Sequence, residues 1–361
     1  MDGFKNIEIK NFRGINYLKI DDFSRVNVFL GQNSSGKSSI LEALLLLSGM
    51  SNPDLPLSLN KSRTRNFRIA YLQDTRYQFY NLDLNNTPDF SADQFDGMSR
   101  HLQMKLSFTE SDEMMVQSID MPLIISEIER TPNTIEMLYD ITNSSGTKHF
   151  RSSLFVNQSD VPSRQEPSKE YVEKNMAVLF SSDLLSSNLN NDLSELFKRK
   201  QKDTLLNILT KFDVRINAIE ILNNDVYIGF SDVEELLPVS MSGDGLRRFL
   251  NIVAGSANPQ NTIVLIDEID NGLHYSAYRK LWEAIFALAV STNKQIFVTT
   301  HSKETLQKLN EILEGHPEYQ DEMALYTLEQ TKLKGHQAYR LPYEGLAEAC
   351  KNNVEIRSVA L

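Results

Sequence analysis

A loop rich in glycine and serine near the N-terminus has the residue pattern of a phosphate-binding site. Residues Gly31–Ser38 fit the pattern G-x-x-x-x-G-K-[ST] without a gap. Glycines let the backbone wrap around phosphates, with N–H groups pointing inward at a helix N-terminus. Lys37 adds positive charge for the β- and γ-phosphates, and the Ser38 hydroxyl can bind Mg²⁺. A surface turn is the alternative, but the flanking strand and helix also fit. The predicted nucleotide contacts are Gly31, Gln32, Asn33, Ser34, Ser35, Gly36, Lys37, Ser38 and Ser39.

Two carboxylates directly follow an apolar run in the C-terminal part of the chain. The run is Ile263–Ile266, and Asp267 and Glu268 come after it. Ligands of α/β sheets lie at the carboxyl ends of the strands. Asp267 can hold Mg²⁺ through water, and Glu268 can polarise the water that attacks the γ-phosphate. Such a run alone is more often an ordinary strand end, but its occurrence with the glycine-rich loop favours catalysis.

A histidine ends the next predicted strand at the same edge of the sheet. His301 follows the apolar and threonine residues Ile296–Thr300. In this position it can hydrogen-bond the γ-phosphate and sense its loss. A lone histidine there would usually be structural, so this prediction depends on the neighbouring motifs.

A segment of small residues precedes the carboxylates by about twenty positions. Ser240–Gly245 leads into a predicted helix, where small residues leave backbone N–H groups open to an anion. The same composition also suits a turn. The spacing to Asp267 favours a phosphate contact. Its register is open, because either Ser242 or Asp244 could face the phosphate.

The predicted elements place these motifs in an α/β fold. At the N-terminus we expect strands over residues 4–10, 17–20 and 26–30, then the loop, then a helix over 39–47. In the C-terminal part we expect a helix from Gly245, strand Thr262–Asp267, helix Tyr275–Val290, strand Gln295–Thr299 and helix Lys303–Leu313. This alternation predicts a parallel sheet covered by helices.

The middle of the chain has a weaker pattern. Candidate strands are Phe67–Tyr71, Leu102–Phe108 and Ile135–Asp140, Asn157–Lys169 suits an exposed loop, 189–212 suits helices, and 215–230 suits a hairpin about Asn223-Asn224. We therefore expect two parts of one α/β domain, 1–50 and 236–361, separated by an inserted mixed lobe, 51–235.

Composition limits the class of protein. The 361 residues are 41% hydrophobic and 24% charged, as in a globular domain. The single cysteine, Cys350, excludes an internal disulfide and suits a reducing cytoplasm. We expect neither a signal peptide nor a membrane helix. The net charge of −11 opposes binding to a DNA backbone, although Lys61–Arg68 and Lys198–Lys202 are locally basic.

Several short motifs together resemble the ABC-type ATPases of the RecF/SMC/OLD group. They are Asn11–Arg13, Gly31–Ser38, Ser242–Gly245, Leu265–Glu268, Asn271–His274 and Thr299–Ser302. The likeness covers residues 4–50 and 236–304 and is greatest for stand-alone AAA family ATP-binding proteins of bacteria and archaea, many associated with phage defence. A closing Val354–Arg357 is also similar to that subgroup.

The resemblance implies an ABC-ATPase-like head with a parallel core sheet, an antiparallel N-terminal β-subdomain and an inserted mixed lobe. It implies that Arg13 lies near the adenine or phosphates. The signature and D-loop residues, which contact the nucleotide of an opposite head, would be Ser242, Gly243, Asp244, Gly245 and Asn271. The signature departs from the usual Leu-Ser-Gly-Gly-Gln, and Gln73 and Gln78 are both candidates for the Q-loop glutamine.

Three classes of function fit these motifs. In the favoured one, ATP and Mg²⁺ close a homodimer that acts as a switch or scaffold for an effector protein. A RecF-like DNA-repair ATPase is the alternative, and a transporter subunit is disfavoured by the Asn-Phe-Arg turn and the missing glutamine of the signature. The chain lacks the heptads of SMC arms, and only sixty residues follow His301, without a convincing Toprim cluster.

Overall fold

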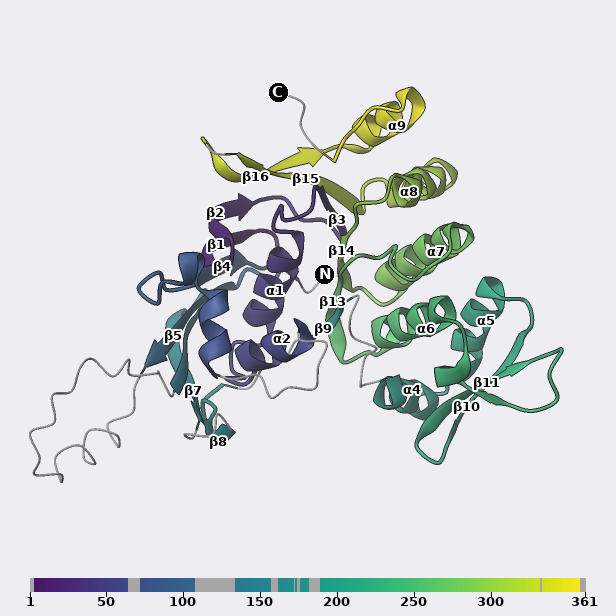
Figure 1. The fold of residues 1–361 in the computed structure, drawn as a ribbon, viewed down its shortest axis with the longest axis horizontal. Coiled ribbons are helices and arrows are strands. Elements are labelled where there is room, and N and C mark those ends of the chain that lie inside the picture. Colours follow the sequence, from purple (N-terminus) through teal and green to yellow (C-terminus); the bar gives the residue numbers. More distant parts are fainter. Residues whose placement is uncertain are drawn as a thin grey trace, which may run out of the picture.

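The computed structural model describes residues 3–63, 72–107, 134–156, 162–171, 173, 176–181, 189–331 and 333–357. A sheet of six strands lies at its centre, in the order β16-β15-β3-β14-β13-β9 (Figure 1). The strands are β3 (Val26–Gly31), β9 (Met176–Phe180), β13 (Asn261–Ile266), β14 (Gln295–Thr299), β15 (Met323–Thr331) and β16 (Gly335–Leu341). All neighbours pair in parallel except β16, which is antiparallel to β15.

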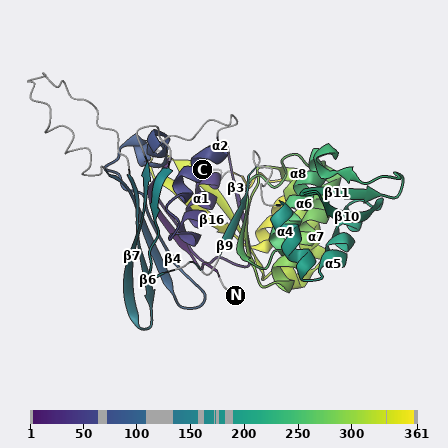
Figure 2. The ribbon, with the colours of Figure 1, turned by 90° about the horizontal axis from the view of Figure 1, so that it is seen from below.

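A second, antiparallel sheet has the order β2-β1-β4-β5-β6-β7-β8. Its strands are β1 (Ile7–Phe12), β2 (Ile15–Ile20), β4 (Asp89–Asp93), β5 (Ser99–Ser107), β6 (Thr134–Asn143), β7 (Gly146–Val156) and β8 (Pro162–Glu166). Helix α1 (Lys37–Ser48) lies between the two sheets (Figure 2). Apolar side chains of both sheets and α1 form one continuous core there.

The opposite face of the central sheet is covered by helices (Figures 1 and 2). These are α6 (Asp244–Ala257), α7 (Tyr275–Ser291), α8 (Lys303–Gly315) and α9 (Tyr343–Asn352). On β13, Val264 and Ile266 face these helices, whereas Ile263 and Leu265 face the α1 side. Strands buried on both faces are apolar throughout, which explains the continuous run seen in the sequence.

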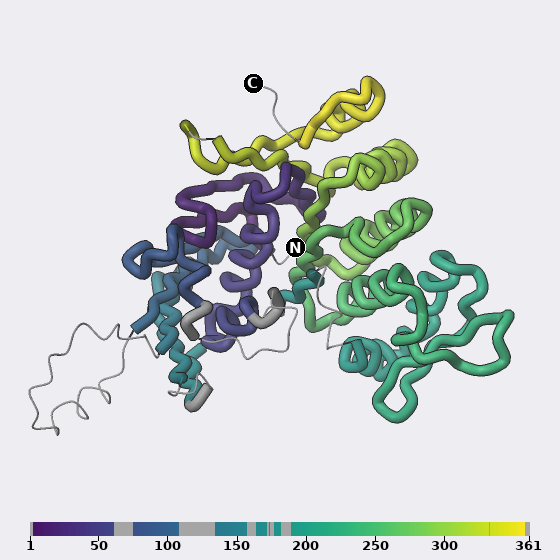
Figure 3. Tube along the Cα trace, viewed as in Figure 1, coloured from purple at the N-terminus to yellow at the C-terminus, as the bar shows by residue number. Residues whose placement is uncertain are grey.

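The segment expected to form one inserted lobe, 51–235, is divided among three places (Figure 3). Strands β4–β8 extend the N-terminal sheet through the pairing of β1 with β4, and α2 (Leu55–Arg63) precedes them. Strand β9 joins the central sheet beside β13. Helices α4 (Leu189–Lys198) and α5 (Lys202–Phe212), with β10 (Ile216–Leu222), β11 (Asp225–Phe230) and β12 (Leu237–Pro238), pack near α6 and α7. The expectation of a single lobe was therefore wrong, because sheet pairing with distant strands decides where these segments lie.

Several local predictions can be compared with the described residues. The helices of 189–212 and the hairpin about Asn223-Asn224 are present. The expected loop Asn157–Lys169 instead contains strand β8, which begins at Pro162 on the sheet edge, where proline is tolerated. The predicted strand Phe67–Tyr71 lies outside the described residues. Among the described helices, none combines the length and apolar character needed to cross a bilayer.

Candidate nucleotide site

The glycine-rich loop connects β3 to α1 at the carboxyl edge of the central sheet. Gly36 has φ of 93°, a left-handed conformation that favours glycine. A Cβ at Gly31 would lie 2.5 Å from the Ser35 hydroxyl and 2.8 Å from the carbonyl oxygen of Leu328. Both glycines are therefore required by the loop geometry. Gln32, Asn33 and Ser34 are exposed, whereas Ser38 and Ser39 are half-buried in the first turn of α1.

Lys37 is buried beneath this loop. Only 8% of the residue is exposed, and its Nζ donates hydrogen bonds to the carbonyl oxygens of Gly31 (2.7 Å) and Gln32 (2.9 Å). The Ser35 hydroxyl is also buried and has no hydrogen-bond partner among the described residues. The loop thus holds a cation and an unused hydroxyl together, which suits a phosphate group.

The acidic strand end is held by Thr299 from the adjacent strand. The Thr299 hydroxyl donates to Asp267 Oδ1 (2.6 Å) and accepts from the backbone N–H of Glu268 (2.8 Å). The Asp267 N–H donates to the carbonyl of Phe180 at the end of β9 (2.7 Å). One threonine therefore fixes both carboxylate residues relative to β14, which lies between β13 and β3.

The glycine-rich loop and the acidic end of β13 lie close to each other. Burial lowers the pKa of Lys37, and the negative charges of Asp267, Glu268 and Asp270 oppose that shift. These carboxylates therefore lie within electrostatic reach of the Lys37 ammonium. The structure thus places Lys37 of the glycine-rich loop near Asp267 and Glu268, as the sequence analysis expected of these three residues.

Glu268 lies in a constrained backbone conformation. Its φ is 48°, in the left-handed region. The Asn271 side-chain amide donates to Glu268 Oε2 (3.4 Å), and the Asn271 N–H donates to the Glu268 carbonyl (2.9 Å). Arg248 Nη2, from α6, donates to the carbonyls of Asp267 (2.8 Å) and Glu268 (2.6 Å). Contacts from Asn271 and from Arg248 on α6 thus converge on the backbone that carries Glu268.

His301 lies in the loop between β14 (Gln295–Thr299) and α8 (Lys303–Gly315). Its side chain is 50% exposed, and Nε2 is 3.9 Å from Asp270 Oδ2. The neighbouring Thr300 hydroxyl donates to the other oxygen of Asp270 (2.5 Å). His301 therefore lies beside the Asp270 carboxylate with its ring half exposed.

The signature segment forms the exposed start of α6. Asp244 begins the helix, its side chain is 74% exposed, and it pairs with Arg247. The Ser242 hydroxyl donates back to the carbonyl of Val239 (2.7 Å). A Cβ at Gly243 would meet no atom within 4 Å, whereas one at Gly245 would lie 3.4 Å from the Gly272 carbonyl. The segment Ser242–Gly245, expected to be the signature, thus lies beside Gly272 of its own chain and is exposed at Gly243 and Asp244.

Two predicted residues make contacts that the sequence did not indicate. The Arg13 guanidinium donates from Nε to Glu42 on α1 and lies over the Phe12 ring. The side chain of Gln78 is buried and donates to the carbonyl of Pro56 (2.6 Å) and to Asn60 Oδ1 (3.0 Å). These packing contacts argue against Gln78 as the Q-loop glutamine, and the side chain of Gln73 lies outside the described residues.

Sequence reasoning missed three residues that organise this site. Thr299 and Asp270 lie inside or beside quoted motifs, but their contacts depend on the register in which Ile266 pairs with Val298. Arg248 lies within a helix, and no local pattern distinguishes it from the preceding Arg247. Its role became visible only through its contacts with the acidic strand end.

Comparison with known proteins agrees with this geometry. Residues 4–306 match the AAA ATPase domain family. The chain is 26% identical over 331 residues to an ATP/GTP phosphatase of Helicobacter pylori, covering 86% of this chain and 88% of that protein. A shorter match, 52% identical over 44 residues, is to the DNA replication and repair protein RecF of Lactococcus lactis and covers 12% of each chain.

Among solved structures, the chain is similar to an Smc head domain with an extended coiled coil, bound to the C-terminal domain of ScpA from Pyrococcus furiosus. The TM-score is 0.50 at 12% identity, over 98% of this chain and 100% of that chain. At this identity the likeness concerns the fold alone. The expectations of an ABC-type head of the RecF/SMC kind and of an ATPase are confirmed. The chain therefore belongs to the AAA ATPase domain family and is an enzyme that binds and hydrolyses ATP.

Proposed function

We propose that ATP closes two of these heads into a homodimer and that hydrolysis reopens it. The observation that carries the proposal is the exposed start of α6, which faces outward. The same chain holds a buried lysine, Lys37, near the carboxylates of Asp267 and Glu268. A helix N-terminus attracts anions. In the dimer, Ser242–Gly245 of one head contacts the γ-phosphate held by Gly31–Ser38 of the other.

The contacts behind α6 support this role. Arg248 joins α6 to the carbonyls of Asp267 and Glu268 by hydrogen bonds. A displacement of the exposed start of α6 would therefore shift the backbone that carries Glu268. Met241, which precedes the signature, is 79% exposed. A nucleotide that contacts two heads favours the dimer by its differential affinity, and ADP, which lacks the γ-phosphate, favours separation.

The side chains of Ser38 and Asp267 suit Mg²⁺. Magnesium prefers oxygen ligands and is commonly held by one or two carboxylates with water. Thr299 holds one oxygen of Asp267 and so fixes the direction of the carboxylate. A bound Mg²⁺ would neutralise charge on the β- and γ-phosphates.

The chain's own residues supply the remaining steps. Lys37 offsets negative charge at the β- and γ-phosphates from a site where burial strengthens the interaction. Glu268 orients the attacking water and accepts its proton. Asn271 holds the Glu268 carboxylate from the D-loop side, and His301 contacts the γ-phosphate and responds to its loss.

The closed dimer would act as a switch or scaffold for an effector protein in the cytoplasm. The resemblance to stand-alone ATP-binding proteins of bacteria and archaea supports a role in phage defence. A nuclease or toxin gene beside this one would agree with that role. Affinity purification of Glu268→Gln protein in ATP, compared with ADP, should recover the effector only from the closed state.

The decisive experiment mixes two inactive chains, Lys37→Ala and Gly243→Glu. Gly243 is the right position because a side chain there meets no neighbour within the head, so the fold should be unaffected. In the mixed dimer, one site pairs an intact loop with an intact signature, and ATPase activity should return. The same substitution at Gly315, an exposed glycine at the end of α8 with open space around it, is the matched control.

Three results would contradict contact between heads. One is an active Gly243→Glu protein. Another is a lack of rescue although mixed dimers are shown to form. The third is failure of the Glu268→Gln protein to dimerise in ATP, measured by light scattering. If this protein does dimerise and the mixed chains show only weak rescue, closure requires ATP in both sites.

A RecF-like DNA-binding ATPase is the second candidate, favoured by the short match to RecF. The described basic segment gives it little support, because Lys198 and Lys202 pair with Glu195 and Glu220. Real phosphate contacts weaken steeply as salt is raised. Tight, salt-dependent DNA binding that stimulates ATP hydrolysis would favour this candidate over the effector switch.

A further inference from the structure

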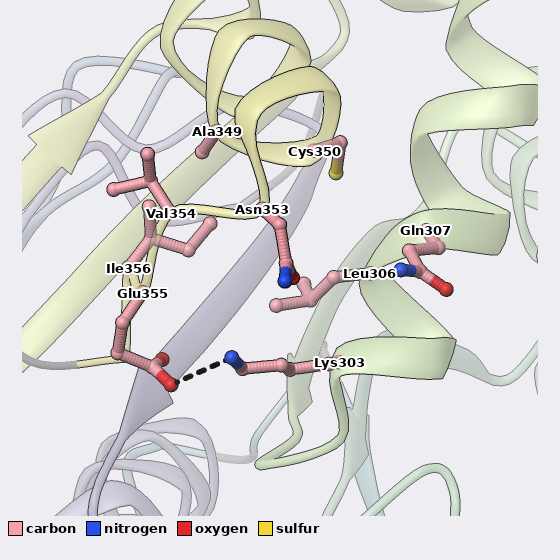
Figure 4. Close-up of a pocket in the computed structure, with 9 residues that line it drawn as sticks. All are labelled: Lys303, Leu306, Gln307, Ala349, Cys350, Asn353, Val354, Glu355 and Ile356. Carbon is pink, nitrogen blue, oxygen red and sulfur yellow. Dashed lines mark ion pairs between the residues drawn. The ribbon is translucent and has the colours of Figure 1, made fainter.

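The C-terminal segment Val354–Arg357, here termed the strap, folds back toward the nucleotide site. After α9 the chain turns at Asn353, whose φ is 51°, and the Val354 N–H bonds the carbonyl of Ala349 (2.9 Å). The Thr327 hydroxyl on β15 donates to the Ile356 carbonyl (2.7 Å). Figure 4 shows Val354, Glu355 and Ile356 of the strap opposite α8, with Glu355 beside Lys303 at the start of that helix. The strap is thus tied to both α9 and the central sheet.

Arg357 contacts the loop that carries His301. Its Nη1 donates to the His301 carbonyl oxygen (2.7 Å). Its Nε and Nη2 donate to the two carboxylate oxygens of Glu355 (2.7 and 2.6 Å), a bidentate arrangement that fixes the plane of the guanidinium. Lys303 Nζ, on the first turn of α8, lies 3.2 Å from Glu355 Oε2 (Figure 4). Hydrogen bonding by Arg357 lowers the pKa of Glu355 to about 2, so the carboxylate stays charged at neutral pH.

Apart from the bond from Arg357, the described contacts hold the loop between β14 and α8 at its two ends. Thr300 is bonded to Asp270, and Ser302 caps α8 by accepting from the Thr305 N–H. The His301 ring is half exposed and 3.9 Å from Asp270. The bond from Arg357 therefore holds the His301 carbonyl, the backbone group between these two fixed residues.

The space under the strap is too small for a ligand. The strap, α8 and α9 border a shallow hollow of about 30 Å³ that is open to solvent on one side and lined in part by Leu306 and Cys350 (Figure 4). A volume of this size holds no more than water. The contacts of the strap are therefore better explained by support of the His301 loop than by binding of a metabolite.

We propose that Arg357 is a positioning residue for His301, so that the strap belongs to the hydrolytic machinery. This inference rests on the role of His301 in the proposed function. A displaced histidine would still allow ATP to bind, because the glycine-rich loop and Lys37 lie on other elements. The defect should appear in kcat and leave the affinity for ATP unchanged.

A double-mutant cycle between Arg357→Ala and His301→Ala tests the inference. We expect Arg357→Ala to lower kcat about tenfold, since small displacements of a reacting group are costly. In the His301→Ala background the same substitution should have no further effect on kcat. Arg357→Lys, which keeps the charge but loses the bidentate fork, should fall between wild type and Arg357→Ala. Lys351→Ala, at an exposed position on α9, is the control and should behave like wild type.

The outcomes distinguish this inference from the proposed function. An equal fall in kcat with and without His301, or a wild-type rate for Arg357→Ala beside an impaired His301→Ala, overturns the positioning role alone. A wild-type rate for His301→Ala overturns the role of His301 itself. If melting shows that Arg357→Ala is misfolded, the cycle with Arg357→Lys decides between the same outcomes.

Discussion

The carboxyl edge of the central sheet and the start of α6 are both assigned to phosphate binding, but their surroundings differ. At the sheet edge, Lys37 is buried, and Asp267 and Glu268 are held by the Thr299 hydroxyl. At the start of α6, Asp244 is exposed, and Gly243 has open space around it. The first region is organised by contacts within one chain, whereas the second is exposed to solvent, as the proposed contact between heads requires.

This difference predicts which substitutions act within a single head and which act only in the proposed dimer. A change in the buried region alters contacts that already exist in the monomer. A change at the exposed helix start removes little from the monomer, so its effect should depend on a second chain. The following predictions run from the largest expected effect to the smallest.

Lys37→Ala should have the largest effect, a loss of ATP affinity of roughly 100-fold, as expected for charged hydrogen bonds to phosphate. Lys37→Met keeps much of the side-chain volume without the charge and is the matched comparison. Isothermal titration of ATP should give the same loss for both. Wild-type affinity in Lys37→Met would show that packing, and not charge, explains the role of this residue.

Glu268→Gln should leave ATP affinity unchanged and lower kcat by about 10²-fold to 10⁴-fold, because the amide cannot accept the proton of the attacking water. Phosphate release measures the rate, and titration of ATP measures the affinity. Glu348→Gln, an exposed position on α9, is the control. Turnover at the wild-type rate would remove Glu268 from the catalytic role.

Thr299→Val is nearly isosteric and removes the hydroxyl that joins Asp267 to the Glu268 N–H. We expect kcat to fall about tenfold, with about 1–3 kcal/mol lost from the free energy of unfolding. Thr300→Val removes the bond to Asp270 and the bond from the Ser302 N–H, neither of which involves Asp267 or Glu268, and should have a smaller effect on kcat. Equal effects of the two variants would show that Thr299 has no special place in the site.

The smallest effects are expected at the exposed signature, where they can decide its register. Asp244→Asn removes an exposed ion pair with Arg247 and should change the free energy of unfolding by less than about 1 kcal/mol. A carboxylate repels a γ-phosphate, so this variant should keep its turnover. Ser242→Ala should lower turnover several-fold. The reverse pattern would make Asp244 the phosphate-facing residue.

Sequence patterns predicted the motifs well, because their function depends on local chemistry. The strand, glycine-rich loop and helix of residues 26–48 follow from periodicity, and so does the acidic end of β13. The position of β9 could not be inferred, because its pairing with β13 joins segments far apart in the chain. The same limit applies to Arg248 and Arg357, whose importance comes from carbonyl groups that only the fold brings near.

The backbone conformation of Glu268 lowers the stability of the fold, whereas its carboxylate is assigned to catalysis. Its left-handed conformation, with φ of 48°, is less favourable for a residue with a Cβ than for glycine by roughly 1–2 kcal/mol. A glycine at this position would relax the turn and also remove the carboxylate. Selection for a stable fold alone would thus favour loss of this side chain during evolution. A Glu268→Gly protein should therefore be more stable than wild type while losing turnover.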